Sequence, residues 1–256
     1  NDKSLLLLKA ESEAAKSPAL AIPTLKALRE FDPNDADVVL RLANTYIAAD
    51  QPQKAVNLLK TQLVSCSGTS DERKVRIALA VALHKSGNKP KSQEIFDLLY
   101  QSVPNDPSPL LAQVRLLKDD KLWSQLSQMV SNWCQNHPED THTLLTIANN
   151  LAAAESSQAQ KTAEDLLHRI LVHDLNSLPA MNTLAMLLQI TGRFEESTVL
   201  YQRVLELEPD NVIAINNLAW IMCEKQGKYQ QALELAQQGL RTAPNYIDLI
   251  DTRGVV

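Results

Sequence analysis

The sequence has few glycines, few aromatic residues, no long apolar run and no long basic run. Six glycines and 4 % aromatic residues in 256 positions leave alanine and leucine to fill the core. Those residues suit closely packed helices better than strands. The apolar run at positions 5–8 is far too short to cross a membrane. A formal net charge of −5 argues against a nucleic-acid surface.

The sequence also lacks the common signatures of enzymes and metal sites. Three cysteines cannot all pair with one another, and no CxxC occurs. Cys134, His137 and His142 are close in sequence, but their spacing matches no common zinc pattern. GxSxG, P-loop and GxGxxG motifs are missing. We therefore expect no catalytic residues, no metal ligands and no cofactor in this chain.

Prolines that follow helix-like segments recur with a period of about 34 residues. Pro104 and Pro138 are 34 residues apart, and Pro209 and Pro244 are 35 apart. Pro33 precedes Pro104 by 71 residues, about two periods. The period predicts an array of similar structural units.

Small residues and glycines recur inside each period. A small residue lets two helix backbones approach closely, and a glycine at a turn supplies the positive φ that ends a helix. The turn glycines are Gly87, Gly192 and Gly227. The small-residue position near the start of each second helix holds, in chain order, Ala21, Ala55, Ser92, Leu126, Ala163, Ser197 and Ala232. Each period is therefore expected to hold two packed helices.

This pattern resembles the tetratricopeptide repeat. The segment 178–211 carries the signature residues of that family at Leu184, Ala185, Gly192, Phe194, Ser197, Tyr201 and Pro209. The resemblance implies an all-α, right-handed superhelical solenoid of antiparallel helix pairs that spans residues 1–256 as a single domain. The expected repeats are 2–35, 36–72, 73–106, 107–140, 141–177, 178–211 and 212–246, followed by a partial repeat at 247–256.

The fourth repeat departs from the family pattern. It has Leu126 at the small-residue position and contains Trp123 and Trp133. We interpret both tryptophans as core substitutions and expect a local change in curvature there. The first residue is Asn1, and segment 247–256 opens a helix without the partner that would cover it. We therefore expect an excerpt of a longer protein, with end-to-end self-association possible through the open C-terminal repeat.

In the family, the concave groove is lined by the second, fifth, ninth and twelfth residues of the first helices. The resemblance places Trp220 in this groove, and a packed position between neighbouring repeats is the alternative. The family's carboxylate clamp needs a lysine at the fifth position, and no repeat has one there. The predicted groove residues are Asn44, Arg115, Asn149, Asn182, Met186, Gln189, Asn216 and Trp220.

The resemblance implies a non-enzymatic scaffold that binds a protein or peptide partner, because amides pair with a peptide backbone while apolar groups take its side chains. Two alternatives stay open. One is an assembly scaffold of a bacterial envelope or exopolysaccharide-secretion machine, and the other is a helical regulatory region of a larger enzyme. The negative net charge argues against membership of the helical-repeat families that bind RNA, because RNA phosphates require lysine and arginine. The compartment, bacterial cytoplasm or cell envelope, is left undecided.

Overall fold

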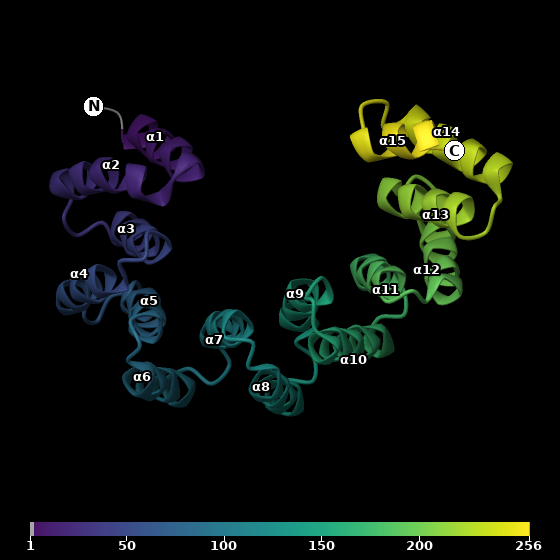
Figure 1. The fold of residues 1–256 in the computed structure, drawn as a ribbon. Helices are drawn as coiled ribbons and strands as arrows, with labels where there is room; N and C mark the ends of the chain where they lie inside the picture. Colours follow the sequence, from purple (N-terminus) through teal and green to yellow (C-terminus); the bar gives the residue numbers. More distant parts are fainter. Residues whose placement is uncertain (1–2, 256) are drawn as a thin grey trace. The chain divides into compact units, whose positions relative to one another are not determined.

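The computed structural model describes residues 3–255 and contains fifteen α-helices over that range, with no strand among them. Helices that are neighbours in the chain are joined by short turns (Figure 1). Most of them form consecutive packed pairs. The expected all-α fold of paired helices is therefore confirmed.

The chain divides into two compact units, residues 1–121 and 122–256. The boundary lies inside the expected fourth repeat. The first unit contains α1 (Lys3–Lys16), α2 (Pro18–Phe31), α3 (Ala36–Ala48), α4 (Pro52–Ser65), α5 (Glu72–Lys85), α6 (Lys89–Ser102) and α7 (Ser108–Asp119). The second contains α8 (Trp123–Asn136), α9 (Thr141–Ala152), α10 (Ser157–His173), α11 (Leu178–Ile190), α12 (Phe194–Leu207), α13 (Val212–Glu224), α14 (Tyr229–Thr242) and α15 (Ile247–Val255).

Polar side chains before several first helices explain where these helices begin. The side-chain oxygen of Asp35 accepts a hydrogen bond from the backbone N–H of Val38 at 3.2 Å. Asn211 accepts from Ala214 at 3.0 Å, and Asp140 does the same at the start of α9. Each bond satisfies an N–H group that the helix itself leaves unpaired.

The turns inside three helix pairs depend on glycine. Gly87, Gly192 and Gly227 have φ values of 88°, 79° and 64°. A side chain at such a φ would be strained, and the predicted turn chemistry is confirmed at these three positions.

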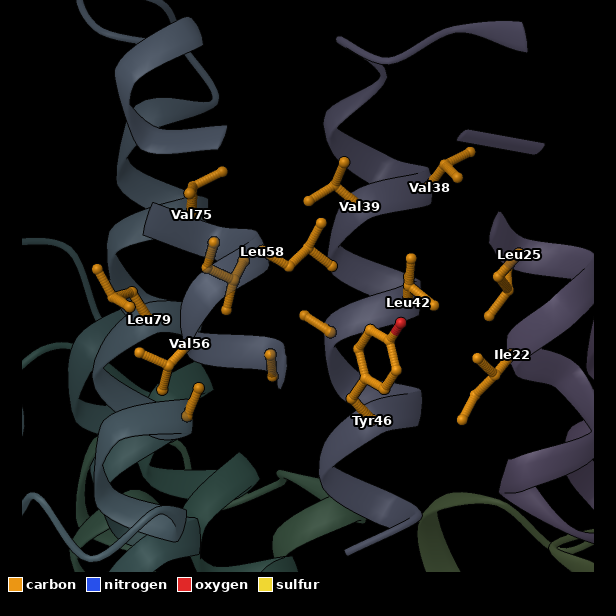
Figure 2. Close-up of a cluster of buried hydrophobic side chains, with 14 of the residues drawn as sticks. Ile22, Leu25, Val38, Val39, Leu42, Tyr46, Val56, Leu58, Val75 and Leu79 are labelled. Atoms are coloured by element: carbon orange, nitrogen blue, oxygen red, sulfur yellow. The ribbon is translucent and has the colours of Figure 1, made fainter. Parts of the chain in front are cut away.

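The core of each unit runs between the helices of a pair and on to the next pair. In the first unit, Leu42 and Tyr46 of α3 face Ile22 and Leu25 of α2 (Figure 2). In the second unit, Tyr201 of α12 belongs to a buried cluster that joins α11 and α13. All seven small-residue positions are 1 % exposed or less, including Leu126. The small side chains therefore lie where the helix backbones meet.

Helix α8 is fixed in the second unit by contacts with α10 and by one tryptophan. Trp133 is buried, its indole N–H donates to Asp140 Oδ2 at 3.0 Å, and its ring stacks on His137 at 3.8 Å between centroids. The interpretation of Trp133 as a core residue is confirmed. Trp123, at the start of the same helix, is half-buried.

A candidate partner-binding face on the first helices

The first helices of successive repeats form one layer within each unit. In the first unit α3 packs on α5 and α5 on α7, and in the second α9, α11, α13 and α15 pack in the same way. Apart from α8 and α10, the second helices pack less closely on one another. Since the layer of first helices is the more closely spaced, its solvent-facing side is the inner side of each unit.

The predicted groove residues lie on these first helices. The first unit contains Asn44 on α3 and Arg115 on α7, both exposed. The second unit contains the other six, on α9, α11 and α13. On α11 the three predicted residues have spacings of four and three, which places them on one helix face: Asn182, Met186 and Gln189.

Trp220 is half-buried and packs against the core cluster of the second unit. Its ring lies 6.4 Å from that of Phe194, the first residue of the preceding second helix. The ammonium group of Lys225 lies 5.1 Å from the Trp220 ring centre and 5.2 Å from the Phe194 ring centre. A cation at this distance is attracted by the aromatic faces. Trp220 is therefore anchored by its neighbours while part of its surface stays accessible.

Phe194 and Lys225 were not identified as site residues from sequence. Both lie next to the turns of their repeats, outside the first-helix positions that the pattern considers. A search for charged and aromatic residues beside Trp220 would have found Lys225, five positions later.

Two of the predicted amide side chains accept hydrogen bonds from the neighbouring first helix. Thr183 donates its hydroxyl hydrogen to Asn149 Oδ1 at 2.7 Å, which ties α11 to α9. In the same way Thr252 donates to Asn216 Oδ1 at 2.8 Å, which ties α15 to α13. These two side chains hold consecutive first helices together.

The two amides of α11 differ from these. The side-chain oxygens of Asn182 and Gln189 are shielded from solvent, and neither accepts a hydrogen bond from any described residue. A shielded acceptor without a donor costs free energy, on the order of 1–3 kcal/mol. A rotation of either amide side chain toward solvent would let its oxygen accept a hydrogen bond from a bound molecule.

Exposed apolar side chains accompany these amides on α11 and α13. Met186 is 39 % exposed, Ile190 52 % and Ile213 51 %. Ile213 was missed in the sequence, although it occupies the second position of its repeat, which the family pattern includes. The second unit thus presents apolar groups on α11 and α13, with two shielded acceptors on α11 and Lys225 directly after the end of α13.

The remaining candidates for chemistry are the cysteine thiols and clusters of metal-binding side chains. All three cysteines are free and buried, and burial raises the pKa of each thiol. Within residues 3–255 no group of three or more His, Cys, Asp and Glu side chains is placed to bind a metal ion. No helix described in the structure combines the length and the apolar character needed to cross a bilayer.

Sequence comparison identifies two regions of family similarity. Sequence models of the tetratricopeptide repeat match residues 13–63 and 176–245. No curated protein matches the chain by sequence.

Comparison with solved structures found distantly similar chains. A thermophilic TPR protein of Thermus thermophilus is 17 % identical, with a TM-score of 0.46 over 72 % of this chain and 98 % of its own. A tetratricopeptide repeat protein of Parabacteroides merdae is 12 % identical, with a TM-score of 0.47 over 99 % of this chain and 98 % of its own. The Naa15/Naa10 complex bound to HypK-THB is 12 % identical, with a TM-score of 0.50 over 98 % of this chain and 38 % of that chain. At such identities the likeness concerns the fold alone.

Proposed function

Because this chain is a tetratricopeptide repeat protein, we propose that it is a non-enzymatic scaffold that binds a protein or peptide partner on its first-helix face. Repeats of this family are generally protein-interaction scaffolds without catalysis of their own. We place the main contact surface in the second unit, on α11 and α13.

The observation that carries this proposal is the pair of free acceptors on α11. Asn182 and Gln189 present shielded oxygens without a donor, with Met186 between them on the same face. A peptide in an extended conformation supplies backbone N–H donors at regular intervals, and its side chains alternate between the two sides of the backbone. When the two amide side chains turn toward such a segment, its backbone N–H groups can supply the donors that the oxygens lack.

The apolar groups nearby would contribute to the affinity of this surface for a partner. Met186, Ile213 and the accessible part of Trp220 can cover apolar side chains of the partner. Anchoring by Phe194 and Lys225 reduces the freedom that Trp220 would lose on binding. Aromatic residues held in this way commonly supply much of the binding free energy of an interface.

The proposal is tested by selecting peptides from a random display library on the immobilised chain and measuring their affinities by fluorescence anisotropy. Gln189→Ala and Trp220→Ala should each weaken the selected peptides by about tenfold or more. Gln202→Ala, on the exposed side of α12, is the matched control for loss of an amide and should leave the affinity unchanged.

Trp220→Phe and circular dichroism separate loss of contact from loss of fold. The Phe variant keeps an apolar ring against the core, so it should bind more tightly than the Ala variant at equal helical content. Selected peptides that bind the parent, Q189A and Q202A chains equally well would refute the proposed surface.

A further inference from the structure

A second surface lies in the first unit, on the side of the second helices. A cavity of about 610 Å³ lies between α2 and α4. Its lining includes Leu42 and Tyr46 of α3, which also face α2 in Figure 2. This region is separate in sequence from the residues of the proposed function.

The helical spacing explains why polar side chains gather around this cavity. Lys26 and Arg29 are three residues apart on α2, so they share a face. Lys54, Asn57 and Thr61 recur at intervals of three and four on α4. Each set lines the space between the two helices.

A hydrogen bond from α4 to the turn after α2 holds one end of this arrangement. The buried side chain of Gln62 donates from Nε2 to the backbone oxygen of Asn34 at 3.3 Å, joining α4 to the turn after α2. Pro33, beside Asn34, also lines the cavity. The spacing between α2 and α4 is thus maintained at this end by a buried contact.

The cations of this cavity have no acidic partner among the described residues. Many cations elsewhere in the unit do form ion pairs, such as Arg41 with Glu11 and Arg73 with Asp106. Lys26, Arg29 and Lys54 form none, and Arg29 Nε is shielded from solvent without a hydrogen-bond acceptor. A shielded, unpaired guanidinium nitrogen indicates a missing acceptor.

Lys54 is held over an aromatic residue of the cavity. Its ammonium group lies 5.9 Å from the centre of the Tyr46 ring and donates to Gln51 Oε1 at 2.7 Å. One carboxylate, Glu30, lines the cavity against three cations, which leaves a local charge of +2 in a chain whose net charge is −5. The local field therefore favours an acidic ligand.

We propose that this cavity binds an acidic peptide segment, with closely spaced carboxylates around an apolar side chain. The cations would receive the carboxylates, and the apolar part of the lining, with Leu42, Leu58 and Pro33, would receive the apolar side chain. A small inorganic anion would use the cations but leave this apolar lining uncovered. The site is independent of the first-helix face, so each proposal can fail without the other.

The test uses the full chain and a fluorescein-labelled hexapeptide, Asp-Leu-Asp-Glu-Leu-Asp, titrated by fluorescence anisotropy. Lys54→Gln should weaken binding by about tenfold, and Lys26→Gln with Lys54→Gln by more. Lys60→Gln is the matched control, because Lys60 is an exposed lysine of the same helix that does not line the cavity. Raising NaCl from about 0.05 M to about 0.5 M should weaken binding to the parent chain.

Three results would overturn the proposal. The first is equal binding of the neutral peptide Asn-Leu-Asn-Gln-Leu-Asn. The second is an equal loss in K54Q and K60Q, which would indicate only a general effect of net charge. The third is displacement of the peptide by inorganic phosphate beyond the effect of chloride at the same ionic strength, which would indicate a phosphate site.

Discussion

Single residues at the helix contacts show how this chain satisfies polar groups inside an alanine- and leucine-rich core. Ser92 and Ser197 occupy the small-residue position of their repeats, and their hydroxyls donate to Ala80 O and Ala185 O, each at 2.7 Å. A serine can thus replace alanine at this contact because a backbone carbonyl of the partner helix accepts its hydrogen. Tyr201 has no such partner. Its side chain is fully buried, and its hydroxyl bonds to no described residue.

At the residue scale, we predict that Tyr201→Phe leaves the free energy of unfolding unchanged or raises it by about 1 kcal/mol, because the variant removes a buried hydroxyl that has no partner. Burial also raises the pKa of this hydroxyl. Tyr100→Phe is the matched control. Tyr100 donates to Gln113 Oε1 at 2.9 Å, so the variant that loses this hydrogen bond should be less stable. Urea denaturation followed by circular dichroism measures both. A decrease in the free energy of unfolding of Y201F as large as that of Y100F would contradict the prediction.

At the scale of elements, the contact among α13, α14 and α15 depends on one glycine. A Cβ atom at Gly239 would lie 2.7 Å from Leu249 Cδ1 and 2.8 Å from Ile215 Cγ2. Both neighbours are buried, so they have little room to move. The missing side chain lets α14 approach two first helices at once.

We predict that Gly239→Ala destabilises the second unit by about 1–3 kcal/mol through overpacking. The change removes a flexible glycine from a helix, which by itself stabilises by about 0.5–1 kcal/mol. Gly254→Ala near the end of α15 is the control without overpacking, because a Cβ there meets nothing within 4 Å. The urea midpoints of the two variants should therefore move in opposite directions, and a stabilised G239A variant would show that the helices can separate without cost.

At the scale of the whole molecule, carboxylates that accept hydrogen bonds from cations and backbone groups concentrate in the first unit. Burial opposes ionisation of Asp106, but the N–H of Ser108 and the guanidinium of Arg73, 2.7 Å away, lower its pKa below the ordinary value. Hydrogen bonds from Lys89 and His84 lower the pKa of Asp120. A lowered pKa in the folded chain means that the unfolded chain binds more protons as the pH falls.

The stability that these carboxylates contribute is therefore complete above about pH 5 and is lost as the pH falls through their lowered pKa values. We predict that the urea midpoint drops between about pH 6 and about pH 3, and that Asp106→Asn reduces this drop. Asp97→Asn is the control, because Asp97 is exposed and, among the described residues, accepts from Gln93 alone. A D106N chain as acid-sensitive as the D97N chain would contradict this assignment.

The sequence alone was sufficient for the features that depend on local chemistry. Proline spacing predicted the period, glycine predicted the positive-φ turns at Gly87, Gly192 and Gly227, and small residues predicted where helix backbones meet. These features follow from backbone sterics and from helix periodicity, which act over a few residues. Helix periodicity is also the reason why the repeat positions that line the groove in the family could be assigned to the first helices of this chain.

Only the tertiary structure decided what those residues can do, because their partners are about 34 positions away in the chain. Asn149 and Asn216 accept hydrogen bonds from Thr183 and Thr252 of the next repeat, whereas the shielded oxygens of Asn182 and Gln189 accept from no described residue. The unpaired cations between α2 and α4 likewise come from separate repeats. A repeat pattern specifies that such side chains lie on a helix face, but whether a hydrogen bond or an ion pair forms depends on the distance and geometry that packing sets.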